Sequence, residues 1–360
     1  MHIECTSRCE NGEKTVDVLV TGAGGRIGSH LSRLLLAEGH TVRAFGLAGD
    51  PGLARVGEAG AEVYDGDLEV PDDLRPAVAG VDAVCHLAAA LTTHDVPDDR
   101  FVDVNLRGTF NVLEAARQHA PGIRRFVYVS SDAVYLSLDE NAAAGEEAGV
   151  IDETTPQRPG TVYGATKVGA ELLCRSYWKT YGIPCSVMRP TATAAPAEFI
   201  SPSSVFGRRW FVNAAVAWYQ ARPQLSDEDR AILAGLREIG DPDRTLFLLT
   251  GPDGLAGTVT YGDSRDAAAG LRTMIDADAA VGEAFNIGPA APCSERDFAE
   301  HLGARLGLGV AEIRRPSPRR QWRVSSDKAR RVLGYSPAHD PLGMIDEAVA
   351  QLSVTERSPM

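Results

Sequence analysis

The alternation of apolar and polar positions is most regular between residues 16 and 45. A β-branched run at 16–20 leads into a glycine-rich stretch, and a helical repeat of apolar residues then runs from Ile27 to Leu35 before Gly39 ends it. Residues 41–45 form a second strand-like run. The pattern predicts a compact β-α-β unit, which needs about 30 residues.

The same alternation continues along the chain. Strand-like runs occur at 62–64, 82–86 and 125–130, and helical repeats occur at 103–118 and 161–178. Strands that alternate with helices through short connections indicate a parallel sheet covered on both faces. The predicted fold class is therefore α/β, a doubly wound parallel sheet whose ligands gather at the carboxyl ends of the strands.

Composition and charge exclude several classes of function. A formal net charge of −13 disfavours nucleic-acid binding, which needs a basic surface. A hydrophobic content of 44% is typical of a soluble globular protein, and no apolar run reaches the about 18 residues of a membrane span. We therefore expect a cytoplasmic protein with neither a membrane nor a nucleic-acid partner.

The six cysteines predict no metal site. They lack the paired spacing of metal ligands, and free thiols fit a reducing compartment. Their positions are Cys5, Cys9, Cys85, Cys174, Cys185 and Cys293.

Three glycines, Gly22, Gly25 and Gly28, lie between the first predicted strand and the first predicted helix with the spacing G-x-x-G-x-x-G. Such glycines allow a tight turn, so that a pyrophosphate can approach the backbone N–H groups at the positive end of the helix. A plain turn is the alternative interpretation of a lone glycine motif. The position between strand and helix favours a dinucleotide site.

Candidate catalytic residues begin where the strand at 125–130 ends, at Ser131. Tyr163 and Lys167 follow on the predicted helix 161–178 and, at i and i+4, project from one face. For Tyr163 to act as a base near neutral pH, an ammonium and a cationic nicotinamide must lower the pKa of its phenol by ~3 units, roughly 4 kcal/mol. The serine hydroxyl would share the substrate oxygen. An amphipathic surface pair is the alternative for Tyr163 and Lys167 alone.

Two other strand ends offer contacts to a cofactor. Asp67 follows the strand at 62–64, where a carboxylate can accept from an adenine amino group, although a solvated turn is an equal alternative. The residues after the strand at 82–86 are mostly small, so that a flat ring or a sugar can lie against the backbone at 87–90.

Several motifs, in the right order, resemble the extended short-chain dehydrogenase/reductase family. Within it, the sequence is most similar to the NAD(P)-dependent epimerase/dehydratase group that acts on nucleotide sugars. The motifs are T-G-A-G-G-R-I-G at 21–28, D-G-D-L at 65–68, H-L-A-A at 86–89, V-N-L-R-G-T at 104–109, V-S-S-D-A-V-Y at 129–135 and Y-G-A-T-K at 163–167.

The resemblance implies a Rossmann-like sheet, an NAD or NADP cofactor and a set of site residues. Tyr163 would be the acid/base, Lys167 its pKa partner and ribose ligand, and Ser131 the hydroxyl that orients the substrate. The other implied cofactor contacts are Gly22, Gly25, Arg26, Ile27, Gly28, Asp67, Leu68, Leu87, Ala88, Ala89 and Asn105. Substrate contacts are predicted at Asp132, Thr191 and Arg323.

Three departures from the family pattern matter. Gly46 stands where NAD-using relatives often carry an acidic residue, which weakens discrimination against NADP, and the cations considered for a 2′-phosphate are Arg26 and Arg43. Ala133 follows Asp132 where 4,6-dehydratases carry a glutamate, so dehydration is not expected. Ala192 replaces an asparagine that commonly holds a phosphate of the sugar nucleotide.

The chain is expected to divide into a dinucleotide-binding domain and a smaller C-terminal lobe for the substrate. The predicted parts are a tail at 1–15, the dinucleotide-binding domain at 16–190, a lobe at 191–350 from which 259–290 returns to the first domain, and a tail at 351–360.

Residues 197–258 fit the family least. The aromatic stretch 206–219 is compatible with a lid, a substrate pocket or a packed helix, and the helix predicted after Ser226 has one apolar face. Five arginines at 314–323 form either a phosphate site, with Arg323 preferred, or a solvated loop.

Together these features predict an NAD(P)-dependent epimerase of a nucleotide-linked sugar, working through a transient ketone and forming a homodimer. A net reductase or dehydrogenase of a sugar or natural-product ketone would use the same three residues, and the missing asparagine at 192 favours it somewhat. A non-catalytic dinucleotide-binding protein would not need Ser131, Tyr163 and Lys167.

Overall fold

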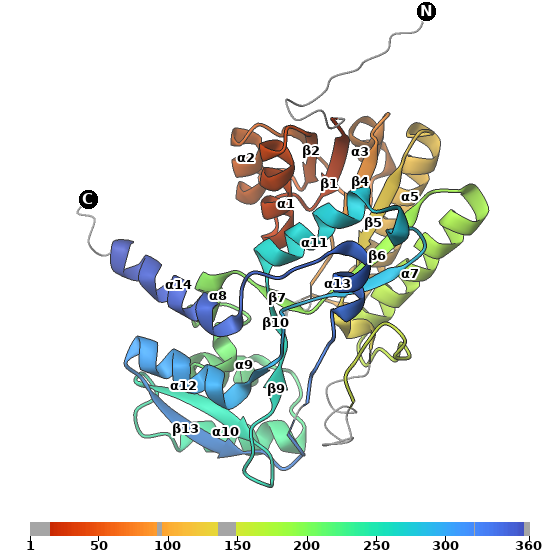
Figure 1. Ribbon diagram of the computed structural model, residues 1–360. Helices are drawn as coiled ribbons and strands as arrows, with labels where there is room; N and C mark the ends of the chain where they lie inside the picture. Colours follow the sequence, from red (N-terminus) through yellow and green to blue (C-terminus); the bar gives the residue numbers. More distant parts are fainter. Residues whose placement is uncertain (1–14, 92–95, 136–148, 320, 356–360) are drawn as a thin grey trace, which may run out of the picture.

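The computed structural model describes residues 15–91, 96–135, 149–319 and 321–355, and the predicted tail at its N-terminal end lies outside these ranges except for Thr15. Seven parallel strands form the central sheet in the order β11-β6-β5-β4-β1-β2-β3 (Figure 1). The predicted α/β fold is confirmed. The strands are β1 (Asp17–Thr21), β2 (Thr41–Gly46), β3 (Glu62–Asp65), β4 (Ala83–His86), β5 (Arg125–Val129), β6 (Cys185–Pro190) and β11 (Ala284–Ile287).

Helices cover both faces of the sheet because its strands are apolar on both sides. Val18 and Val20 of β1 enter one core, and Leu19 between them enters the other. The first core is closed by α1 (Arg26–Ala37), α2 (Pro51–Glu58), α11 (Ser264–Asp276) and α13 (Asp327–Leu333). The second is closed by α3 (Pro71–Val78), α5 (Gly108–His119) and α7 (Val162–Tyr181).

The helix predicted at 103–118 is not a single α-helix. The short α4 (Asp98–Phe101) runs into a π-helical segment, η1 (Val102–Arg107), and α5 begins only at Gly108. Such wide turns concentrate at functional sites, because they displace side chains from the regular helical pattern. Asn105 lies inside this segment and is buried.

The smaller lobe lies below the sheet in Figure 1 and is built from short strand pairs and helices. The pairs are β7 (Ala192–Ala194) with β10 (Tyr261–Asp263), β8 (Thr245–Thr250) with β13 (Gly309–Arg314), and β9 (Thr258–Val259) with β12 (Cys293–Ser294). The helices are α8 (Pro196–Phe199), α9 (Val212–Ala221), α10 (Asp227–Arg237), α12 (Glu295–Leu306) and α14 (Pro341–Thr355), with a short 3₁₀ turn at η4 (Gly207–Arg209). Two other 3₁₀ turns, η2 (Asp132–Val134) after β5 and η5 (Asp278–Ala280) before β11, belong to the domain of the central sheet.

The region least like the family packs as ordinary protein interior. Ser226 caps α10 as expected, and the apolar face of that helix lies against Phe247 and Ile313. The aromatic stretch contributes to two cores: Trp210 stacks on Phe298 with ring centroids 4.7 Å apart, and Tyr219 is buried beneath α10. None of the described helices is long and apolar enough to span a bilayer.

Candidate active site

The glycine-rich turn joins β1 to α1 at the carboxyl end of the sheet. Gly22 has a φ of +68°, and a Cβ there would lie 2.8 Å from the backbone nitrogen of Ala88. A Cβ on Gly28 would lie 2.2 Å from the carbonyl oxygen of Gly22. Side chains at either position would therefore break the close approach of helix, turn and neighbouring strand.

The residues of this turn fit the pyrophosphate of a dinucleotide. Gly25 is the N-cap of α1 but has no side chain, and the first turn of the helix contains no acidic residue. The N–H groups at the start of α1 therefore lack a capping side chain and lie at the positive end of the helix dipole, an arrangement that suits an anionic ligand.

Arg26 and Ile27 follow in the first turn of α1. The guanidinium of Arg26 does not point to a free anion site, because it forms a bidentate ion pair with Glu198 of α8 at 2.5 and 2.6 Å. The ring of Phe206 lies 5.5 Å from the same guanidinium carbon. The predicted contact of Arg26 with the cofactor is therefore limited to its main chain.

The two other predicted cofactor loops follow β3 and β4 of the same sheet. Asp67 follows β3 and accepts a hydrogen bond from the backbone N–H of Glu69, whereas the side chain of Leu68 is buried. Leu87, Ala88 and Ala89 follow β4 and are half-buried.

Asn105 fixes the loop after β4 rather than facing outward. Its side-chain oxygen accepts from the N–H of Ala90 at 2.7 Å, and its amide nitrogen donates to the carbonyl of Ala90 at 3.0 Å. Both ends of the amide thus hold the backbone of one residue, Ala90, so that Asn105 fixes the loop after β4 from within.

A buried polar chain under the same loop was not predicted. The hydroxyl of Thr21 lies 2.7 Å from Nδ1 of His86, whose Nε2 lies 3.0 Å from the hydroxyl of Thr109. Thr21 also accepts from the N–H groups of Leu87 and Ala88. Burial lowers the pKa of His86 to about 3, so the imidazole is neutral. The only signals in the sequence for this hydrogen-bonded chain are the T-G motif at 21–22 and the H-L-A motif at 86–88.

Ser131, Tyr163 and Lys167 come together at the carboxyl end of β5. Thr161 caps α7, and the helix places Tyr163 and Lys167 one turn apart. Nζ of Lys167 lies 5.8 Å from the ring centroid of Tyr163 and donates to the carbonyl of Val129 at 2.9 Å. Both side chains are buried, which excludes the surface-pair interpretation.

The pKa values of this group are set mainly by burial. Burial raises the pKa of Tyr163 to about 12, opposed by a hydrogen bond with Ser131. Burial also lowers the pKa of Lys167 to about 8. The ammonium of Lys167 does not cancel the effect of burial on Tyr163. The side chains of the site therefore do not by themselves lower the pKa of Tyr163 as the sequence predicts.

Asp132 lies next to Ser131 and is held by a residue from the distant end of the chain. The indole Nε1 of Trp322 donates to Oδ2 of Asp132 at 2.8 Å, and Ser131 donates to the other oxygen at 3.3 Å. Burial raises the pKa of Asp132 to about 6, although both hydrogen bonds oppose the shift. The loop that carries Trp322 was singled out from the sequence only for its arginines, so this contact was not predicted.

The remaining predicted substrate residues occupy different settings. Thr191 is buried in the turn after β6, with its side chain against Gly288. Arg323 follows Trp322 and is half-buried. Its backbone carbonyl oxygen accepts a hydrogen bond from the N–H of Ile151. Arg315 is buried against Glu228 and is therefore committed to an ion pair, and Arg320 lies outside the described residues.

A buried ion pair supports the carboxyl end of β5. Arg189 at the end of β6 donates to both carboxylate oxygens of Glu171 on α7, at 2.9 and 2.7 Å. Glu171 also accepts from Ser130 and Gln157, so its charge is fully hydrogen-bonded. This network fixes α7 against β5 and β6 and thereby orients Tyr163 and Lys167.

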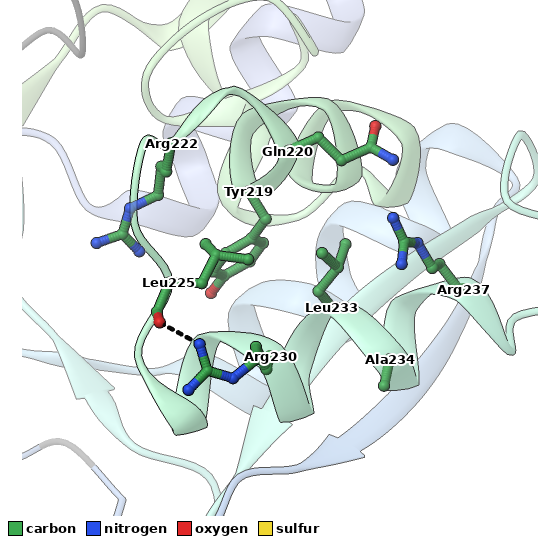
Figure 2. A pocket seen from close by; sticks show the side chains of 8 residues that line it. All are labelled: Tyr219, Gln220, Arg222, Leu225, Arg230, Leu233, Ala234 and Arg237. Carbon is green, nitrogen blue, oxygen red and sulfur yellow. Dashed lines mark hydrogen bonds between the residues drawn. The ribbon is translucent and has the colours of Figure 1, made fainter.

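A cavity of about 520 Å³ lies elsewhere, between α9 and α10. Figure 2 shows the side chains that line it, with Tyr219, Leu225 and Leu233 at its floor and three arginines around it. It contains none of the predicted site residues. Among the described residues, no group of three His, Cys, Asp or Glu side chains is arranged to hold a metal ion.

Comparison with known proteins identifies the family. The model of the NAD dependent epimerase/dehydratase family matches residues 18–288, most of the chain, and the protein belongs to this family. The resemblance to extended short-chain dehydrogenases/reductases is thereby confirmed. A solved structure of a short-chain dehydrogenase/reductase superfamily protein from Agrobacterium tumefaciens with bound NAD has a TM-score of 0.81 and 29% identity, covering 95% of this chain and 100% of that chain.

Curated relatives include both reaction types of the family. The dTDP-glucose 4,6-dehydratase of Streptomyces griseus is 30% identical over 342 residues, 91% of this chain and 90% of the relative. The GDP-mannose 3,5-epimerase 1 of Oryza sativa subsp. japonica is 34% identical over 182 residues, 48% of this chain. The match spans 45% of that epimerase's own length, less than half of it.

Proposed function

We propose that this protein is an epimerase that inverts a carbinol carbon of a nucleotide-linked sugar through a transient ketone. The observation that carries the proposal is the convergence of Ser131, Tyr163 and Lys167 at the carboxyl end of β5, the edge of the parallel sheet that also carries the glycine-rich turn. A protein that only binds a dinucleotide would have no use for this buried group.

The chain's own residues handle the proton of the reacting hydroxyl. Tyr163 takes this proton at its phenolic oxygen and later returns it, and Ser131 holds the same substrate oxygen by a hydrogen bond. The ammonium of Lys167 would hold the ribose of the dinucleotide, and the positive charge of the oxidised nicotinamide would be needed to favour the phenolate, because the side chains alone do not offset the burial of Tyr163. A bound nicotinamide dinucleotide supplies the hydride acceptor and donor.

Dehydration is disfavoured by one position. Elimination of water after oxidation needs one group to remove the proton next to the ketone and another to protonate the leaving hydroxyl. Asp132 is present, but the methyl group of Ala133 cannot serve as the second. General acid/base assistance contributes roughly 10² to 10⁴ in rate, so elimination should be far slower than hydride return.

NAD rather than NADP is the proposed cofactor. Arg26 and Arg43, the two cations considered from the sequence for a 2′-phosphate, both have guanidinium groups that are engaged within the protein. Arg26 pairs with Glu198, and Arg43 pairs with Asp17 at 2.6 Å and donates to three backbone carbonyls. Neither guanidinium is therefore available to bind a 2′-phosphate through two parallel N–H groups.

The proposal includes a homodimer. Phe110 of α5 and Tyr181 of α7 are exposed apolar residues, and the ring of Tyr177 lies between them, with ring centroids 6.4 and 5.2 Å away. Leu172 of α7 is 56% exposed. An apolar surface on two adjacent helices suits a symmetric interface. The molar mass measured by light scattering tests this.

A panel of nucleotide sugars tests the reaction. After incubation, an epimer keeps the substrate mass and separates by chromatography, whereas net oxidation or reduction changes the mass by two hydrogens. A product lighter by one water at a catalytic rate would contradict the assignment of Ala133. The nucleotide released from the purified protein discriminates further, because an epimerase regenerates its cofactor in each turnover and retains it.

Net redox is the second candidate, and it is favoured by one observation. Ala192 occupies the position of a phosphate-holding asparagine, so the substrate need not carry the usual diphosphate. Stoichiometric consumption of added dinucleotide with a sugar or ketone would identify this activity.

A further inference from the structure

We propose that Arg26 and Glu198 form a clasp that keeps the substrate lobe closed on the dinucleotide site and must open before the dinucleotide leaves. The inference rests on the dinucleotide site of the proposed function but not on the sugar or on the reaction type. It gives both residues a role in cofactor retention.

The clasp joins parts of the chain that are 172 residues apart. Arg26 donates through Nε and Nη2 to the two oxygens of Glu198, at 2.5 and 2.6 Å. Phe206 adds a cation–π contact from the same lobe. A two-bond planar contact of this kind fixes orientation as well as distance.

Glu198 is itself held in place. It is in the first turn of α8, and its carboxylate also accepts the N–H of Ala195 at 2.8 Å. Ala195 follows β7 directly, and β7 follows the end of β6 across Thr191. The clasp therefore connects the turn to the chain segment that leaves the carboxyl edge of the sheet.

The other half of the clasp belongs to the pyrophosphate cradle. Arg26 is the first residue of α1, immediately after Gly25, so its N–H is one of those at the uncapped helix start. A carboxylate this close to an anion site would repel a diphosphate if it were unpaired. Arg26 neutralises Glu198, and the pair closes the site without placing a free negative charge there.

Moving the lobe away from the turn separates the two charges. The pair is partly shielded, with side chains 30% and 23% exposed, so its rupture has a moderate cost. Dinucleotide release would therefore require opening against the clasp, and release would be slower than from a site lacking it.

The experiment measures NADH release from the full-length protein by stopped-flow fluorescence. Glu198→Gln keeps an oxygen for the N–H of Ala195 and removes the charge, and Arg26→Gln removes the other partner. Glu198→Gln is expected to release NADH about fivefold faster, the factor that a partly exposed ion pair contributes. Arg26→Gln should release it faster still, because it also leaves the carboxylate of Glu198 unpaired beside the anion site. The double variant should release it no faster than the single variants.

Glu312→Gln is the matched control. It makes the same substitution in the ion pair of Arg296 with Glu312, at 2.7 Å on the outer side of the lobe, and should leave the release rate unchanged. A release rate within twofold of wild type in both clasp variants, or an equal acceleration in the control, overturns the proposal. The proposal is also overturned if the clasp variants bind NADH more weakly only because association is slower.

The outcomes separate this inference from the proposed function. A wild-type protein that binds NADH but converts no nucleotide sugar contradicts the proposed reaction and leaves the release measurement decisive for the clasp. A wild-type protein that binds neither NADH nor NADPH overturns both. Circular dichroism of each variant identifies a folding defect. Glu198→Asp keeps the charge on a shorter side chain and provides a second variant for the release measurement.

Discussion

The indole of Trp322 donates a 2.8 Å hydrogen bond to the carboxylate of Asp132, the residue next to the predicted catalytic serine. The two residues are 190 positions apart in the sequence. The contact connects the arginine-rich loop to the end of β5. Asp132 is half-buried next to Ser131, and the loss of solvation raises its pKa, which has measurable consequences.

Asp132→Asn is expected to change the pH dependence of stability. Burial raises the pKa of Asp132 from an ordinary 3.8 to about 6 in the folded protein. Between these values the folded state holds a proton that the unfolded chain has lost, so Asp132 makes the protein less stable as pH rises through this window. Asparagine keeps an acceptor for Trp322 and does not ionise. In thermal unfolding, the stability of the variant relative to wild type should increase as the pH rises to about 6 and stay constant above it. A difference that does not vary with pH would contradict the assignment.

Tyr163→Phe should abolish turnover while preserving the fold. Phenylalanine fills the same buried space but has no group to accept the substrate proton, and general base assistance contributes roughly 10² to 10⁴ in rate. The measurement compares steady-state activity with dinucleotide affinity by direct titration. Near-normal activity with intact affinity would exclude Tyr163 as the acid/base.

The affinity for the dinucleotide should fall as pH rises through about 8, because burial lowers the pKa of Lys167 to about 8 and the ribose then loses an ammonium ligand. Fluorescence titration with NADH between pH about 6 and about 9.5 measures this, a window chosen around that pKa. Lys167→Met should bind more weakly at low pH and show no inflection near pH 8. An inflection that persists in the variant would assign the titration to another group.

Gly46→Asp should raise the ratio of NAD affinity to NADP affinity. A Cβ at residue 46 would meet the side chain of Leu53 at 3.4 Å, an ordinary contact, so the new side chain can be accommodated. Its carboxylate would bind the ribose hydroxyls and repel a 2′-phosphate. Isothermal titration with both dinucleotides checks the ratio. No change would show that residue 46 does not lie at the adenosine ribose.

Local patterns were sufficient for the fold and for the predicted catalytic pair. The β-α-β unit at the start of the chain follows from periods of two and 3.6 residues, and Tyr163 and Lys167 share a helix face because four positions separate them. These relationships are set by neighbouring residues, so they can be derived from spacing. The π-helical turn around Asn105 could not, because it departs from the regular repeat.

Contacts between distant segments could not be predicted from spacing. Nothing near Arg26 indicates Glu198, and nothing near Asp132 indicates Trp322, because both partners arrive from the substrate lobe. The pKa of Tyr163 also depends on how deeply the finished fold buries it. A sequence identifies the groups that can react, whereas the fold decides which of them are paired, buried or charged.

The position of β11 in the sheet has a consequence for the order of synthesis. β6 pairs with β5 on one side and with β11 on the other, yet β11 is made only after α8, α9, α10 and α11. During translation, the fully buried residues of β6 form an unpaired sheet edge until β11 emerges. Chaperone occupancy on ribosome-bound chains should therefore be highest between the emergence of these two strands.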